Sequence, residues 1–255
     1  MNVKGKTAII TGATGKLASQ IVLSMAKAGA NCICIYNSNT VKAKKLAADL
    51  RKLKQKTLFI SADLTAEENI EKVFACFEKF KTPQILINAA SIFEKKPLEN
   101  VTFDYIRQTF DINFAAHIML THKFVELVRR KIKSKQKPLA KIINFTDITV
   151  LRPPAGFSIY CASKAALLSA TKSLAKELAP DFTVNAVSPG IVSWPFGLAQ
   201  GGQKGVTAEQ KKKMLSQVPV GRAGSPEEVA DAVKFLIEND YVTGQVIDVD
   251  GGRGL

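Results

Sequence analysis

The 255-residue sequence has few cysteines, a deficit of acidic residues and no long apolar run. No apolar segment approaches the roughly 20 residues that a membrane-spanning helix needs. A strand pattern begins at residues 6–11, which leaves no room for a signal peptide, so we expect a cytoplasmic protein. The cysteines lack metal-ligand spacing, and Cys32 and Cys34 alternate within one apolar strand, so buried thiols and no metal site are expected.

The deficit of acidic residues leaves a formal net charge of +14, which raises the possibility of a nucleic-acid-binding protein. The lysines are spread over expected helix faces at residues 42–56, 123–141 and 204–213, without interleaved aromatic residues. We therefore interpret the charge as a solvated, lysine-rich surface that also attracts an anionic cofactor and substrate. A content of 46% hydrophobic and 23% charged residues is typical of a soluble, globular protein.

Apolar, β-branched segments alternate with helical patterns along most of the chain, which is typical of a parallel sheet covered by helices on both faces. We predict one α/β domain over residues 1–255, a single Rossmann-type doubly wound parallel sheet of about seven strands. The strands are expected near residues 6–11, 31–36, 57–61, 84–88, 141–146, 182–187 and 245–249. The helices are expected near residues 16–28, 41–53, 66–80, 101–131, 158–179, 208–216 and 226–238.

The functional interpretation depends on the segment from residue 142 to residue 164. Tyr160 and Lys164 are four residues apart in an expected helix, so their side chains share one face. A cation near a phenol favours the phenolate and brings the tyrosine pKa, ordinarily near ~10, toward neutral pH. Tyr160 is therefore a candidate general acid, although such pairs also occur in ordinary helices. Asp147 follows a buried strand, where open α/β sheets place their ligands.

Tyr160-Cys161-Ala162-Ser163-Lys164 has the form Tyr-x-x-x-Lys of the short-chain dehydrogenase/reductase family, which this sequence resembles over essentially its whole length. Most members carry serine thirteen positions before the tyrosine, where this chain has Asp147. In this respect the chain is similar to the pteridine reductases, which carry aspartate there. The resemblance implies that Asp147, Tyr160, Lys164 and Asn113 are catalytic, with Asn113 holding a water beside the tyrosine and the lysine.

The first expected strand leads through Gly12, Thr14 and Gly15 into a helix, which predicts a phosphate-binding loop. Small residues there let backbone N–H groups approach a pyrophosphate. Lys16 and Leu17 resemble the basic residue and leucine that pteridine reductases often carry, and this resemblance places Lys16 near the cofactor phosphates and the pterin. The alternative is a solvated Lys16 that the helix dipole disfavours.

The second expected strand ends at Tyr36-Asn37-Ser38-Asn39, with no acidic residue to bind the adenine ribose hydroxyls, which favours NADP over NAD. The three polar residues can donate hydrogen bonds to a 2′-phosphate. Alternatively, they form a turn and cap the helix that begins near Thr40.

The resemblance extends the cofactor site to other segments, although Asp63 could equally be an ordinary cap or turn residue. The expected cofactor-binding residues are Gly12, Thr14, Lys16, Leu17, Tyr36, Asn37, Ser38, Asn39, Asp63, Leu64, Asn88, Ala89, Ala90, Tyr160, Lys164, Pro189, Gly190, Ile191 and Ser193.

Ser91 and Phe93 follow the fourth expected strand and again resemble residues that line the substrate site of pteridine reductases. A flat pterin can stack between an aromatic ring and the nicotinamide while a hydroxyl meets its polar edge. The alternative is that Phe93 packs in the core. A glycine-rich loop at about 193–217 is expected to be mobile and to fold over the substrate. The expected substrate-binding residues are Lys16, Ser91, Phe93, Asp147, Tyr160 and Trp194.

These observations predict an NADPH-dependent reductase that converts a dihydropterin or dihydrofolate to its tetrahydro form. Because the charge of Asp147 opposes a phenolate at Tyr160, Asp147 is expected to be partly protonated or to face the amino edge of the pterin. An alternative is a carbonyl or 3-oxoacyl-thioester reductase, although an ionised Asp147 would repel the developing oxyanion. A second alternative is a non-catalytic dinucleotide-sensing protein on the same fold. The family resemblance implies a homotetramer, with neither nucleic acid nor a membrane as partner.

Overall fold

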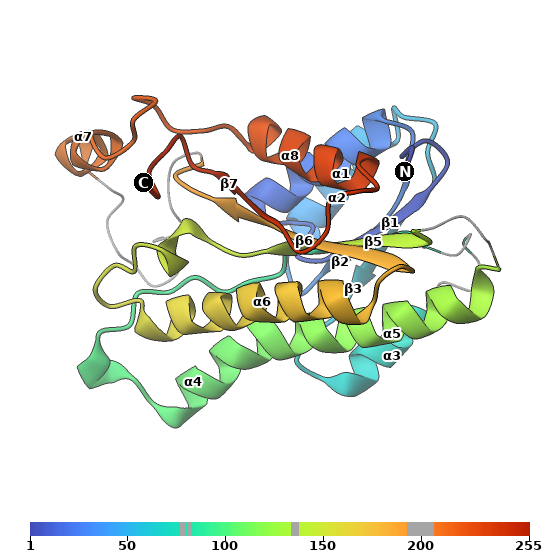
Figure 1. Cartoon of the computed structure of the whole chain (residues 1–255), viewed down its shortest axis with the longest axis horizontal. Coiled ribbons are helices and arrows are strands. Elements are labelled where there is room, and N and C mark those ends of the chain that lie inside the picture. The colour runs from blue at the N-terminus through green and yellow to red at the C-terminus, as the bar shows by residue number, and fades with distance from the viewer. Residues whose placement is uncertain (77–79, 81–82, 134–137, 193–206) are drawn as a thin grey trace.

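The computed structural model of the chain describes residues 1–76, 80, 83–133, 138–192 and 207–255 (Figure 1). Seven parallel strands form one sheet in the order β3-β2-β1-β4-β5-β6-β7, which confirms the predicted Rossmann-type fold. Helices α1, α2 and α8 cover one face of the sheet, and α3 to α6 cover the other (Figure 1). Every helix among the described residues is too short or too polar to span a lipid bilayer.

The strands lie within two residues of their predicted positions. They are β1 (Thr7–Ile10), β2 (Asn31–Tyr36), β3 (Thr57–Ser61), β4 (Ile85–Asn88), β5 (Ala140–Phe145), β6 (Phe182–Pro189) and β7 (Val246–Val249). Alternate residues of a strand point to opposite faces. Ala8 and Ile10 of β1 therefore pack under α1 and α8, whereas Ile9 packs under α5. Burial on both faces explains why the central strands are continuous apolar runs.

The helices also follow the predicted pattern, with one difference. They are α1 (Lys16–Lys27), α2 (Thr40–Leu50), α3 (Glu67–Ala75), α4 (Phe103–Phe110), α5 (Ala116–Lys131), α6 (Ser158–Glu177), α7 (Ala208–Leu215) and α8 (Pro226–Glu238). The single helix predicted over 101–131 is divided by a π-helical segment, Asp111–Ala115, between α4 and α5. Such segments are rare and occur frequently at functional sites. The hydrophobic periodicity of the sequence does not reveal a π-helical segment, because the helix axis continues in the same direction through it.

A buried charge cluster joins the chain start to the sheet. Lys141 of β5 is fully buried, and its ammonium donates at 2.8 Å both to the Asn239 carbonyl and to the Asp240 carboxylate. The Met1 amino group binds the same carboxylate at 2.7 Å. Burial lowers the pKa of Lys141, and the hydrogen bond and charge of Asp240 act against that shift. Asp240 therefore compensates a cation that has no access to water.

We expect Asp240→Ala to lower the free energy of unfolding by about 1–3 kcal/mol, because it leaves the Lys141 ammonium buried without its counterion. The expected loss of the free energy of unfolding is smaller than that for a fully buried pair, because Asp240 is half exposed. Urea denaturation measures the change. The double variant Lys141→Met/Asp240→Ala is the control, and it should recover most of the loss because the buried charge is gone. A single variant as stable as the wild type would contradict this account.

Candidate active site

The candidate active site is built where β5 ends and α6 begins. Tyr160 and Lys164 lie one turn apart on α6, and both are buried, with 4% and 2% of their surface exposed. Asp147 follows β5, and its Oδ1 accepts a hydrogen bond of 2.8 Å from the Thr149 amide, which caps the short 3-10 helix Ile148–Val150. The Tyr160 hydroxyl donates to the other oxygen, Oδ2, at 2.7 Å. The cap therefore fixes the direction in which Asp147 meets Tyr160.

The expectation that Lys164 lowers the pKa of Tyr160 is wrong for this arrangement. Burial, the charge of Asp147 and the hydrogen bond to it raise the Tyr160 pKa well above its ordinary value. The Lys164 ammonium instead donates to the Phe145 carbonyl at 2.8 Å and lies 5.9 Å from the centre of the Tyr160 ring. Burial lowers the pKa of Lys164 to about 8, with the charge of Asp147 acting in the opposite direction. Tyr160 is thus a neutral phenol at neutral pH.

An aromatic cluster lies beside this pair. The ring of Phe93 meets the Tyr160 ring edge-on, with centroids 4.7 Å apart and an interplanar angle of 82°. The Phe93 ring stacks on Phe157, also at 4.7 Å, with an angle of 20°. Phe157 was not singled out from the sequence, although an aromatic residue three positions before Tyr160 at the start of the helix is a usable signal. Phe93 is half-buried and lines a cavity, so it is not simply a core residue.

Two cavities flank the glycine-rich turn, share several of its residues and together hold most of the predicted site. One, of about 340 Å³, is lined by Gly12, Gly15, Lys16, Leu17, Ala18, Ala89, Ser91, Phe93, Phe145, Thr146, Asp147, Tyr160, Lys164, Pro189, Gly190 and Val192. The other, of about 370 Å³, is lined by Gly12, Thr14, Gly15, Ile35, Tyr36, Asn37, Ser38, Asn39, Lys42, Ala62, Asp63, Leu64, Ala89, Ala90, Ser91, Ile92 and Ile112. The first cavity is lined by the predicted catalytic residues except Asn113 and by the predicted substrate residues except Trp194, which lies outside the described residues, and the predicted adenine-side residues line the second.

The glycine-rich turn fits a dinucleotide pyrophosphate. Gly12 has φ +63°, and a Cβ there would lie 2.8 Å from the Ala90 Cα, so only glycine is accommodated. The Thr11 hydroxyl accepts hydrogen bonds of 2.9 Å from the amides of Ala89 and Ala90, which fastens the turn to the end of β4. No side chain caps α1 at Gly15, so the first amides of α1 keep the arrangement that binds anions.

At the second cavity, two predicted residues also have structural roles. Asn39 caps α2 by accepting from the Lys42 amide at 3.0 Å, and Asp63 accepts from the amide and hydroxyl of Thr65. The helix-cap alternative is therefore confirmed for Asn39 and the turn alternative for Asp63, while both residues still line the cavity. Lys42 was missed from the sequence, yet it adds a cation where no arginine was found. Its position in the first turn of the helix that follows the second strand is the signal that could have identified it.

Asn113, in the π-helical segment, has a structural role that the sequence did not indicate. Its side chain accepts from the Ile92 amide at 2.9 Å and the Ser91 hydroxyl at 3.1 Å, and it donates to the Ile92 carbonyl and the Ser163 hydroxyl, both at 3.1 Å. The fully buried side-chain amide therefore joins Ser91 and Ile92 to Ser163 of α6. The expected water-holding role of Asn113 stays a prediction.

Some predicted residues do not line the cavities. Asn88 is buried and donates to Asn144 Oδ1 at 2.9 Å, which links β4 to β5. Ile191 is buried. Ser193 and Trp194 lie outside the described residues, as does the predicted loop up to residue 206. The described end of that loop contains α7.

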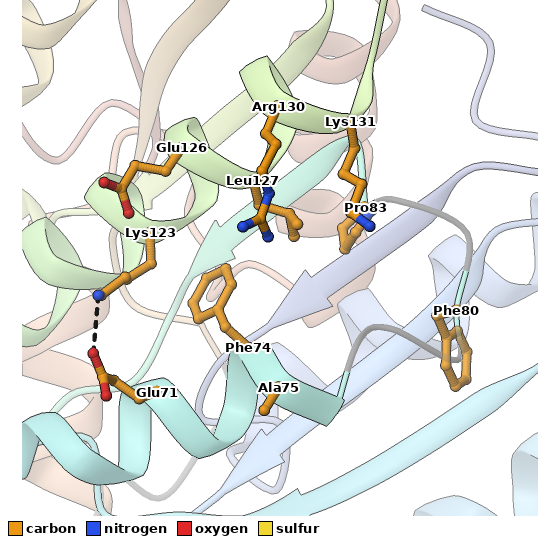
Figure 2. A pocket seen from close by; sticks show the side chains of 10 residues that line it. All are labelled: Glu71, Phe74, Ala75, Phe80, Pro83, Lys123, Glu126, Leu127, Arg130 and Lys131. Atoms are coloured by element: carbon orange, nitrogen blue, oxygen red, sulfur yellow. Dashed lines mark hydrogen bonds and ion pairs between the residues drawn. The ribbon is translucent and has the colours of Figure 1, made fainter.

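A larger cavity, of about 450 Å³, lies elsewhere, between α3 and α5 (Figure 2). Glu71 and Lys123 form an ion pair at 3.0 Å on its wall (Figure 2). None of the predicted site residues lines it. Size alone therefore does not identify the active site, and the chemistry lies in the two cavities at the ends of the strands. The larger cavity is lined by Glu71, Phe74, Ala75, Phe80, Pro83, Lys123, Glu126, Leu127, Arg130 and Lys131.

Comparisons with known proteins agree with this geometry. The family described as enoyl-(acyl carrier protein) reductase matches residues 12–253. Two 3-oxoacyl-(acyl-carrier-protein) reductases, from Rickettsia bellii and Aquifex aeolicus, are 34% and 32% identical to the chain, over 99% of the chain and 98% of each relative. Two solved structures match over 100% of both chains with a TM-score of 0.86, a short-chain dehydrogenase/reductase of Serratia marcescens at 25% identity and a blue fluorescent protein from a metagenomic library in complex with NADPH at 27%. The chain therefore belongs to the short-chain dehydrogenase/reductase family.

Proposed function

We propose that this protein is an NADPH-dependent reductase that converts a dihydropterin to its tetrahydro form. The observation that carries the proposal is the hydrogen bond of 2.7 Å from Tyr160 to the carboxylate of Asp147. An acidic group in this place suits a substrate with a basic ring nitrogen and an amino edge, both of which interact favourably with a carboxylate. Phe93, backed by Phe157, offers an aromatic surface for a flat ring. A homotetramer stays a prediction of the family resemblance, and a cytoplasmic location stays a prediction from the sequence pattern.

In this proposal, bound NADPH supplies the hydride to a ring carbon of the substrate. Tyr160 delivers the proton to the adjacent nitrogen, because its raised pKa keeps the phenol protonated over the working pH range. Asp147 holds the phenol in position and takes part in returning a proton to it from solvent. Lys164 binds the cofactor ribose, and the Phe145 carbonyl fixes the direction of its ammonium.

A reductase of 3-oxoacyl thioesters is the second candidate, and the relatives favour it because the two named above are such enzymes. The geometry at Asp147 argues in the other direction. Carbonyl reduction develops negative charge on an oxygen, and a half-buried carboxylate hydrogen-bonded to Tyr160 would raise the energy of that charge. The two candidates share the fold, the cofactor and Tyr160, so substrate turnover separates them.

The test is NADPH oxidation by the purified protein, followed by absorbance, with a dihydropterin or an acetoacetyl thioester as substrate and NADH as the parallel cofactor. We expect turnover of the dihydropterin with NADPH and none of the thioester. Turnover of the thioester alone would reject the pterin proposal and support the second candidate.

The rate should depend on pH through Lys164. A lysine is charged below its pKa, so activity should be present at lower pH and lost as pH rises through about 8, the pKa of Lys164. Asp147→Asn should move this loss of activity to lower pH, because the charge of Asp147 raises the Lys164 pKa. The same variant should lower kcat by about 10²- to 10⁴-fold, the usual contribution of an acid–base group. Full activity in Asp147→Asn and in Asp147→Ala would reject the role of Asp147.

Lys42 should set the preference for NADPH over NADH. Lys42→Ala removes a cation from the cavity that contains Asn37, Ser38 and Asn39, so KM for NADPH should rise about 10- to 100-fold while KM for NADH stays the same. Steady-state kinetics with both cofactors measures the change. Lys45→Ala, on the same helix but outside the cavity lining, is the matched control and should leave both values unchanged. An equal rise for both cofactors would contradict a contact with the 2′-phosphate.

A further inference from the structure

Three buried polar atoms without a hydrogen-bond partner among the described residues belong to two neighbouring residues behind the active site. They are both ring nitrogens of His117 and the Oδ1 of Asn88, and both residues are fully buried. His117 lies on α5 one turn before Thr121, and such residues share a helix face. Thr121 in turn accepts from the Asn88 amide at 3.3 Å, so this face of α5 packs on the end of β4. Buried polar groups are rarely left unpaired, because each costs the full desolvation of the group.

The surroundings of His117 connect it to the catalytic lysine. Burial and the charge of Lys164 lower the pKa of His117 to about 3, while a hydrogen-bonding interaction between the ring and the backbone of Ala90 acts in the opposite direction. The ring is therefore neutral, with one N–H donor and one acceptor nitrogen. Lys164, from α6, is the charged group that acts on the ring, whereas Asn88 and Ala90 from β4 and the following loop are uncharged. A neutral acceptor beside an ammonium is a favourable arrangement.

Lys164 itself requires further acceptors. Its ammonium carries three donors and is almost fully buried, and the Phe145 carbonyl takes one of them. We propose that His117 is a positioning residue of the active site, whose ring holds one or two internal waters that bridge the Lys164 ammonium and Asn88 Oδ1. The ring nitrogens of His117, the Lys164 ammonium and Asn88 Oδ1 would give such a water the polar partners that a buried water needs. The internal water would then accept one N–H of the Lys164 ammonium, and the remaining N–H would point toward the cofactor site.

The experiment compares His117→Leu, which keeps the volume but removes the polar atoms, with His117→Gln, which keeps a donor and an acceptor. The readouts are the melting temperature and the high-pH limb of kcat with whichever substrate the enzyme reduces. His117→Leu should move the limb to lower pH by about one unit, because the ammonium loses a hydrogen-bonded partner, and it should lower the melting temperature. His117→Gln should keep both the high-pH limb of kcat and the melting temperature close to their wild-type values.

Thr7→Val is the matched control, because the Thr7 hydroxyl is also buried and unpartnered but lies at the opposite end of β1. It should leave the pH limb unchanged and keep or raise the melting temperature, since removing an unpaired polar atom relieves its cost. If His117→Leu behaves like Thr7→Val, the ring only fills space and the proposal is overturned.

A measurement on the wild-type protein decides the case in which His117→Leu does not fold. A high-resolution crystal structure should show water bonded to a His117 ring nitrogen and to the Lys164 ammonium. A His117 ring packed against protein atoms, with no ordered water bonded to either nitrogen, would overturn the proposal. This inference rests on the proposed function only through the role of Lys164. Because the melting temperature and the crystal structure require no substrate, its failure can be distinguished from a wrong substrate assignment.

Discussion

The hydrogen bond between Tyr160 and Asp147 is the interaction on which the chemistry of the site depends. It places the half-buried carboxylate of Asp147 2.7 Å from the buried phenol, and both the charge of Asp147 and the burial of Tyr160 keep the proton on Tyr160. The direction of Asp147 follows from a local constraint, because its second oxygen caps the 3-10 helix that begins at the next residue. A hydroxyl at this position would leave Tyr160 with a different pKa and a different partner. Position 147 is therefore the point at which the two candidate substrates separate.

The sheet order brings the rest of the site to this pair. β1, β4 and β5 are neighbours, so the glycine-rich turn, Ser91 with Phe93, and Asp147 meet at one edge although they are far apart in the sequence. Behind that edge, buried polar contacts hold the strands and helices in register, including Asn88 with Asn144 and Asn113 with Ser163. His117 and Asn88 add to this polar layer buried atoms that have no hydrogen-bond partner in the part of the chain that the structure describes. The relatives establish the family and favour thioester reduction, whereas the carboxylate at residue 147 favours a pterin.

Several expectations failed for one physical reason, which is that side-chain direction and burial are not local properties. Lys164 shares a helix face with Tyr160, as the spacing indicates, but its ammonium turns to the Phe145 carbonyl and does not stabilise a phenolate. The bonds from the Asn113 side chain to the loop after β4 were likewise not evident from the sequence, because they join residues about twenty positions apart. Phe157 and Lys42 join the site only through the folded chain, because packing brings Phe157 onto Phe93 and places Lys42 beside the cavity that contains Asn37.

The sequence by itself determined the alternation of strands and helices, the phosphate-binding turn and the spacing of Tyr160 and Lys164. These depend on hydrophobic periodicity and on residues close together along the chain. Only the tertiary structure decided the π-helical segment, the direction of Asp147 toward Tyr160 and the pKa shifts of the buried groups. Desolvation and charge act through space, so their effect on Tyr160, Lys164 and His117 depends on neighbours that packing alone brings together.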